Sequence, residues 1–236
     1  ERLMRRLTIA VIIACGLAGC TVSTGSGTRT QAPQSVPSSS NSQNTSFAAI
    51  VRRVEPVAEQ VCRQRGNVRN CNFKIVLDSR PDAPANAFQT LDSNGRPILI
   101  VTSALLKELR NPDEVAFVLG HEASHHIEGH IPKTQDSALA GAVLAGMIVA
   151  AGGGNVQAVE SAQQIGAQVG SRTFSKNFEL EADRLGTVIA HRAGYDPVVG
   201  VMYFARSPDP GDRFLGSHPP NSDRIGIVRQ TAAKLQ

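Results

Sequence analysis

Residues 111–130 read NPDEVAFVLGHEASHHIEGH, and this stretch decides the fold of the chain. Asn111 is a good helix cap, the proline after it suits the first helical position, and the two acids that follow favour the positive end of a helix dipole. The sequence therefore predicts a helix that runs to about Gly129. His121 and His125 are one turn apart on it, so both imidazoles lie on one face, about 40° apart around the axis.

The spacing of His121, Glu122 and His125 predicts a zinc site. Two imidazoles one turn apart can reach the same ion, and Glu122 lies beside them, where its carboxylate can take a proton from a metal-bound water. Zinc lowers the pKa of such a water from about 15.7 towards about 7 and polarises a carbonyl group as a Lewis acid. The same motif also occurs on solvated helix faces. The apolar run from Val115 to Gly120 instead indicates a buried helix, where unpaired polar groups would be costly.

A zinc site of this kind needs a third protein ligand. The best candidate lies on a second predicted helix, Lys176 to Arg192, where Glu179 and Asp183 are one turn apart and share a face. If Glu179 is a ligand, Asp183 can form a hydrogen bond with the ring nitrogen of a ligand histidine that faces away from the metal. This bond would orient that imidazole. An ordinary acidic helix face is the alternative interpretation.

Three other polar residues near these motifs are not expected to be ligands. His126 points about 100° away from His125, and His130 is one residue out of register for the longer motif that ends in a third histidine. We expect both at the surface or behind the ligands. Glu181 is two residues from Glu179 and points to nearly the opposite side of its helix.

The two motifs together resemble the HtpX-like, or Ste-type, zinc metallopeptidases, which are gluzincins. The resemblance rests on HExxH followed roughly fifty residues later by ExxxD within FELEADRLG, with Gly120 before the first motif and His130 after it. It extends to Ser217-His218-Pro219-Pro220 and Arg224, which look like the family's C-terminal His-Pro…Arg element. It thus covers the expected folded part of the chain, residues 47–236.

This resemblance implies a zinc-dependent endopeptidase in which Glu122 is the general base. One Zn²⁺ per chain would be held by three side chains: His121, His125 and Glu179. His218 would stabilise the oxyanion of the tetrahedral intermediate, and Arg224 would pair with carboxylates of the site. Asp183 would hold a ligand imidazole from behind.

The resemblance also implies how substrates bind and what they are. Residues Asn86, Ala87 and Phe88 resemble the family's strand that lines the cleft, to which a substrate could add as an extra strand. Envelope-facing relatives of this type degrade misfolded or misassembled outer-membrane proteins, so the implied role is protein quality control. A chaperone-like or assembly lipoprotein that uses the same fold without proteolysis is the alternative, and a latent protease is another.

The first twenty residues have the pattern of a bacterial lipoprotein signal. Three arginines precede an apolar run, Leu7 to Ala14, and the small residues Ala18 and Gly19 come just before Cys20. This pattern is typical of a secretory signal, and small residues followed at once by Cys resemble a lipobox. We therefore expect a signal peptide over residues 1–19 and a lipid on Cys20. A membrane-spanning helix is the alternative, although the run is shorter than the roughly 20 residues that a span needs.

The remaining organisation follows from composition. Residues 20–46 are polar and rich in Ser, Thr and Gly, so we expect a flexible tether, followed by one folded domain over residues 47–236. Such a chain would be a periplasm-facing lipoprotein of the bacterial envelope. We expect the outer membrane rather than the inner one, because Thr21 stands where Asp would resemble an inner-membrane retention signal. The net charge of +4 comes from scattered basic residues, and no nucleic-acid partner is expected.

Cys62 and Cys71 remain once Cys15 leaves with the signal and Cys20 carries lipid. An even pair in an oxidising compartment predicts a disulfide, here between the end of the first helix and the first strand. Two buried thiols are the alternative.

The pattern of elements predicts an α+β class: a mainly helical, zincin-like domain with a small sheet at the cleft edge. Strands are expected at Phe73 to Leu77, Asn86 to Gln89 and Ile98 to Val101. Further helices are expected at residues 47–65, 156–169 and 198–205, and from Ser222 or Asp223 onward. Ser137 to Gly154 is a long run of small and apolar residues, interpreted as a helix packed closely inside the domain. A membrane-dipping hairpin and a plug of the cleft are the alternatives.

Overall fold

The computed structural model describes residues 39–66, 70–173, 175–209 and 218–235. All of them belong to one compact unit that spans Pro37–Gln236. The expected signal peptide, residues 1–19, and the expected lipidation site, Cys20, lie outside the described residues.

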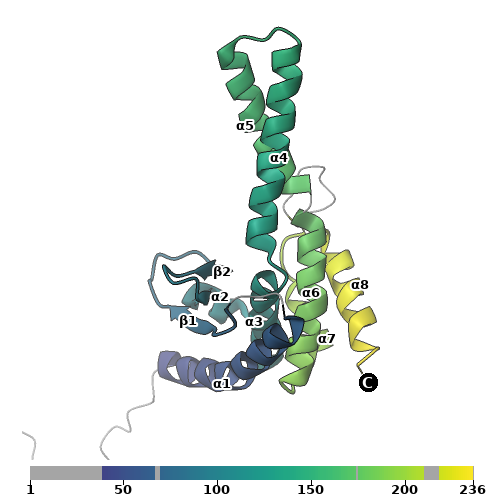
Figure 1. Cartoon of the computed structure of the whole chain (residues 1–236). Helices are drawn as coiled ribbons and strands as arrows, with labels where there is room; N and C mark the ends of the chain where they lie inside the picture. The colour runs from purple at the N-terminus through teal and green to yellow at the C-terminus, as the bar shows by residue number, and fades with distance from the viewer. Residues whose placement is uncertain (1–38, 67–69, 174, 210–217, 236) are drawn as a thin grey trace, which may run out of the picture. The chain divides into compact units, whose positions relative to one another are not determined.

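The described part is mainly helical with one small sheet, as Figure 1 shows, and the expected α+β class is confirmed. Its elements are α1 (Ser39–Arg65), β1 (Lys74–Asp78), β2 (Ala87–Leu91), β3 (Pro97–Thr102), α2 (Ser103–Glu108), α3 (Pro112–Ile127), α4 (His130–Ala151), α5 (Val156–Thr173), α6 (Ser175–Arg192), α7 (Pro197–Gly200), a 3₁₀ turn (Val201–Tyr203) and α8 (Asn221–Ala232). The helix expected over residues 198–205 is therefore a short α-helix followed by a 3₁₀ turn.

Helix α3 is the centre of the domain. Asn111 caps it as expected, because its side-chain oxygen accepts a hydrogen bond from the backbone N–H of Glu114 at 2.9 Å. Every residue from Glu114 to Ser124 is buried, and the helix packs against α1, α6 and α7. Gly129, with φ of +69°, allows the chain to turn sharply into α4. The motif residues are thus fixed by a helix that is buried on most sides.

Helices α3 and α6 cross at very close range because glycines face each other. A Cβ atom added to Gly120 would lie 2.8 Å from the carbonyl oxygen of Gly186, and one added to Gly186 would lie 2.8 Å from the backbone nitrogen of His121. Any larger side chain at either position would force the two backbones apart. This close approach brings the acidic motif of α6 within reach of the histidines of α3.

The sheet has the order β1-β3-β2, with β1 parallel and β2 antiparallel to β3. Leu99 and Val101 of the central strand are buried in the core. β2 is an edge strand, and its register places Phe88 opposite Ile100. Asn86 precedes β2 and is held by a backbone hydrogen bond to Thr102 at 3.0 Å. The expected strand near the cleft therefore exists, shifted by one to two residues.

The N-terminal helix is longer than expected and is tied to the sheet. Residues 39–46, assigned from sequence to the tether, are helical in α1, and Phe47, which follows them, is buried. A helix nucleated by packed residues extends into polar ones at little cost, because each added residue contributes a hydrogen bond. The sulfur atoms of Cys62 and Cys71 are bonded in a disulfide, which links the end of α1 to the segment before β1.

The interpretation of Ser137 to Gly154 as a packed inner helix is wrong. These residues form most of α4, which pairs with α5 in a hairpin that contacts α3 and α6 only near its base (Figure 1). Large apolar side chains of the hairpin are exposed: Leu139, Val143, Leu144, Met147, Ile148, Val156, Ile165 and Val169. The small residues face α5 and leave the large ones outside. By length and composition alone α4 is apolar enough to cross a membrane, and the membrane-contacting alternative stays a prediction.

Candidate metal centre

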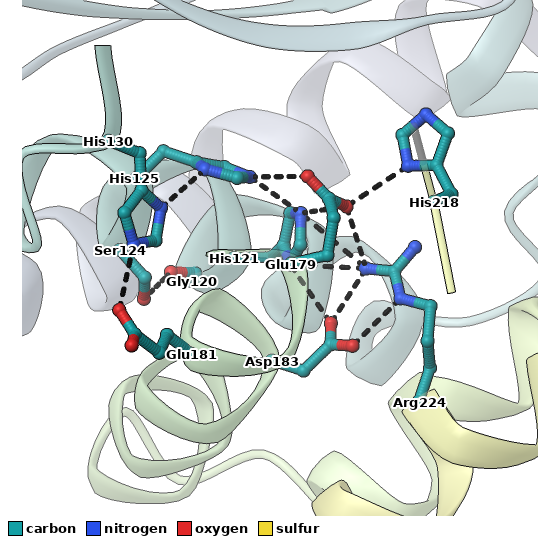
Figure 2. A network of polar contacts seen from close by, with 10 residues as sticks. All are labelled: Gly120, His121, Ser124, His125, His130, Glu179, Glu181, Asp183, His218 and Arg224. Atoms are coloured by element: carbon teal, nitrogen blue, oxygen red, sulfur yellow. Dashed lines mark hydrogen bonds and ion pairs between the residues drawn. The ribbon is translucent and has the colours of Figure 1, made fainter. Parts of the chain in front are cut away.

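Three side chains meet where α3 and α6 cross (Figure 2). The Nε2 atoms of His121 and His125 lie 3.0 Å apart. The carboxylate oxygens of Glu179 lie 3.3 Å from Nε2 of His125 and 3.6 Å from Nε2 of His121. The structure therefore brings together the three residues expected as ligands, within 4.8 Å of one another.

The spacing of these atoms fits a tetrahedral zinc ion. With zinc–ligand bonds of about 2.0–2.1 Å, neighbouring ligand atoms of a tetrahedral site lie about 3.3 Å apart. The observed separations are close to that value: 3.0 Å between the two Nε2 atoms, 3.3 Å from His125 to Oε1 of Glu179 and 3.6 Å from His121 to Oε2 of the same carboxylate. Two nitrogens and one carboxylate oxygen are also a donor set that zinc accepts with a fourth position left for water or substrate.

The ionisation of Glu179 suits a ligand. Burial raises the pKa of this carboxyl group, but hydrogen bonds to His125 and His218 and the charges of His121 and His125 outweigh burial and hold the pKa well below its ordinary value. The side chain is therefore a carboxylate across the physiological range, as metal coordination requires.

An ion pair holds His121 through Nδ1, the ring nitrogen that does not face the other expected ligands. Its Nδ1 lies 2.9 Å from Oδ1 of Asp183, and both carboxylate oxygens of Asp183 accept hydrogen bonds from Arg224 at 2.7 Å. Burial raises the pKa of Asp183, but the charge and hydrogen bonds of Arg224 outweigh it and leave the pKa below 3.8. An ionised Asp183 only accepts hydrogen bonds, so Nδ1 of His121 carries the proton and Nε2 presents its lone pair to the site.

Arg224 is itself fixed in place. Its guanidinium group is buried and stacks on the ring of Phe204 at 3.7 Å from the centroid. The arginine therefore lies where the family resemblance implied, beside the carboxylates of Asp183 and Glu179.

Glu122 and His218 border the same hollow as the three clustered side chains. This hollow, of about 490 Å³, is also lined by Ala87 and Phe88 of β2 and by the first turns of α4, at Ile131, Thr134 and Gln135. His218 lies at the rim, more than half exposed, with Nδ1 3.1 Å from Oε2 of Glu179. Asn86 lines a smaller neighbouring hollow of about 160 Å³. None of the residues 137–154 lines the larger hollow.

Sequence reasoning missed one set of contacts. His130, at the start of α4, lies against His125, and Glu181 of α6 contacts His130 from the other side. Both were considered from the sequence, but not as partners of each other. His126, in contrast, points away from the cluster, and its Nε2 lies 2.7 Å from the carbonyl oxygen of Asn70.

A buried helix carrying HExxH, crossed by a second helix that supplies a carboxylate from ExxxD, is the arrangement of a metallopeptidase domain. Residues 46–232 match the family model described as Peptidase family M48, and the chain belongs to this family. The resemblance noted in the sequence is therefore confirmed, as is the enzyme class of metalloprotease.

Curated relatives are similar over part of their length. A beta-barrel assembly-enhancing protease of Yersinia pestis is 27% identical over 205 residues, which cover 77% of this chain and 40% of the relative. The mitochondrial metalloendopeptidase OMA1 of Arabidopsis thaliana is 26% identical, with 56% of this chain and 27% of the relative covered. The beta-barrel assembly-enhancing protease of Escherichia coli K12 is 26% identical, with 64% and 33% covered. The chain thus spans less than half the length of each relative.

Proposed function

We propose that this chain is a zinc-dependent metalloendopeptidase that acts in protein quality control in the bacterial envelope. The observation that carries the proposal is the convergence of the Nε2 atoms of two imidazoles and one carboxylate at separations of 3.0 to 3.6 Å, with Glu122 beside them in a hollow of about 490 Å³. His121, His125 and Glu179 would hold the ion. When bound, zinc would lower the pKa of a water and polarise the carbonyl group of the substrate.

The chain's own residues would do the rest of the chemistry. Glu122 takes a proton from the attacking water and later delivers it to the leaving amine. Its position one residue after His121 places the carboxylate at the wall of the hollow, close to the three ligands. His218 donates a ring N–H to the oxygen on which negative charge develops. Its 3.1 Å contact with Glu179 supports this role, because it puts the ring at the edge of the metal position.

The edge strand β2 suits peptide substrates. Among the described strands, β2 is at the outer edge of the sheet. Two of its residues, Ala87 and Phe88, line the hollow. An extended substrate can add to this edge through backbone hydrogen bonds, which accept many side-chain sequences. Unfolded segments of proteins are the substrates that this geometry favours.

The envelope location rests on other support. The pattern of residues 1–20 is typical of a lipoprotein signal, and two of the relatives compared above are bacterial proteases named for enhancing β-barrel assembly. We therefore propose that Cys20 is lipidated, that residues 20 to about 38 act as a tether, and that the outer membrane holds the lipid. Metabolic labelling with a radioactive fatty acid should mark the wild-type chain and leave Cys20→Ala unlabelled.

The proteolytic assignment is tested by Glu122→Gln in the full chain. Casein cleavage should fall by about 10²–10⁴-fold, since a general base contributes that much, while zinc content and thermal stability stay unchanged. The matched control is Glu160→Gln on the exposed face of α5, which should cleave as the wild type does. If envelope function survives Glu122→Gln in full, the chaperone-like alternative is right and the protease assignment is wrong.

A further inference from the structure

The first residue of α4 reaches back to the metal centre. His130 is only 4% exposed, and its Nδ1 lies 2.8 Å from Nδ1 of His125. On its far side, Nε2 of His130 lies 3.2 Å from Oε2 of Glu181. Its ring stacks on Phe178 at 4.6 Å between centroids, with the planes 16° apart. Figure 2 shows the resulting line of contacts from Glu181 through His130 to His125.

These contacts determine where the protons lie. A carboxylate only accepts hydrogen bonds, so Nε2 of His130 carries a proton that it donates to Glu181. Neutral His130 then has a lone pair on Nδ1, which accepts the Nδ1–H of His125. His125 is left with a lone pair on Nε2, the atom that lies among the other expected ligand atoms.

The opposite arrangement would remove the ligand. If Nδ1 of His130 carried the proton, it would donate to Nδ1 of His125, and the proton of neutral His125 would have to sit on Nε2. An Nε2–H group cannot bind a metal ion. The orientation of this one hydrogen bond therefore decides whether His125 is competent.

We propose that His130 is a positioning residue that holds His125 in the tautomer with a free Nε2, and that Glu181 and Phe178 hold His130 in turn. This inference rests on the proposed zinc site. It gives the two ligand histidines different supports: His121 is held by the ion pair of Asp183 with Arg224, and His125 by a neutral imidazole. Gly129 makes the second support possible, because its left-handed conformation turns the chain so that His130 faces back to α3.

Zinc affinity of the full chain, measured with zinc alone against a chromophoric chelator, tests the role of His130. His130→Leu removes the acceptor but keeps an apolar side chain against Phe178, and it should weaken zinc binding by about 10–100-fold. His130→Asn places an amide oxygen where Nδ1 was and should recover most of that loss. The matched control is His126→Leu on the neighbouring position, which should bind zinc as the wild type does, since His126 bonds to Asn70 instead.

Wild-type zinc affinity in His130→Leu would overturn the inference. An equal loss of zinc affinity in His130→Asn, or in the control His126→Leu, would overturn it as well. A second measurement does not depend on variants or on zinc. In the metal-free protein with ¹⁵N-labelled histidine, long-range ¹H–¹⁵N correlation should show the proton of His130 on Nε2 and that of His125 on Nδ1. A proton on Nδ1 of His130 contradicts the inference. Failure of the wild-type chain to bind zinc would instead contradict the proposed function.

Discussion

Two pairs of helices in this protein pack through glycine, but their outer surfaces differ. In α3 and α6, Gly120 and Gly186 bring the two backbones together. In α4 and α5, a Cβ atom on Gly141 or Gly166 would collide with the carbonyl oxygen of the other glycine. Both crossings are so close that neither tolerates a side chain. The same local device thus builds two very different parts of the molecule.

The difference lies in what surrounds each crossing. Around α3 and α6, polar side chains point inward, and each meets a partner: His121 meets Asp183, and Asp183 meets Arg224. Around α4 and α5, apolar side chains point outward, and Leu139 and Ile148 are about two-thirds exposed, at 66% and 65%. Small residues in a sequence therefore indicate how closely two helices approach. Which other faces of those helices are buried depends on the elements packed around them.

The largest effect is expected from Arg224→Met, which leaves the buried carboxylate of Asp183 without its partner. The free energy of unfolding should fall by about 3–5 kcal/mol, as for other buried ion pairs broken on one side. Urea denaturation measures it. Arg229→Met, on the exposed face of the same helix, is the control and should change little. A loss below about 1 kcal/mol for Arg224→Met would show that this ion pair does not support the α3–α6 crossing.

The same variant should change the pH dependence of stability. In the wild type, burial raises the pKa of Asp183 but Arg224 outweighs it, so the pair stabilises the fold above pH 3.8 and loses this effect as pH falls through the depressed pKa. In Arg224→Met burial is opposed only by the contact with His121, so the pKa of Asp183 rises and stability falls as pH rises. The difference in unfolding free energy should therefore shrink below about pH 4. A difference that stays constant from pH 7 to pH 3 would contradict this assignment of charges.

One pair of substitutions tests the roles of the two glycine crossings independently. Gly120→Ala should push α6 away from α3, lower the unfolding free energy by about 1–3 kcal/mol and weaken zinc binding. Gly141→Ala should splay the hairpin without changing zinc affinity, because residues 137–154 do not line the hollow at the candidate metal centre. Chelator competition and thermal unfolding provide both readouts. Equal losses of zinc affinity would show that the hairpin positions the ligands after all.

The smallest effect is expected on the hairpin surface. Leu144→Gln combined with Met147→Gln replaces two side chains that are each 58% exposed, so unfolding free energy should stay within about 0.5 kcal/mol. Self-association, followed by light scattering, should decrease because an apolar surface is lost. A loss of more than about 1 kcal/mol would mean that these side chains are buried, as the sequence first suggested.

Much of the candidate metal centre could be predicted from the sequence, because it depends on single helices. The i, i+4 spacing of His121 and His125 fixes their common face, and Asn111 fixes where the helix starts. The same applies to Glu179 and Asp183 on α6. Predicting that these residues share a face requires only the period of an α-helix, about 3.6 residues per turn.

The rest depends on how separate elements meet, which the period does not determine. His130 reaches His125 only because Gly129 reverses the chain at a positive φ, and Glu181 meets His130 only because α6 lies alongside. The exposure of Leu144 was mispredicted for the same reason. Its apolar character suggests burial, but no described element other than α5 packs along the length of α4.

The central claim is that α3 and α6 together form one zinc site, and metal content tests it most directly. After dialysis against a small excess of zinc, the purified full chain should contain close to one zinc ion per molecule. Glu179→Ala should contain far less under the same conditions, because two imidazoles alone hold the ion weakly. The control Glu160→Ala, exposed on α5, should match the wild type. An unchanged content of one zinc per chain in Glu179→Ala would contradict the account.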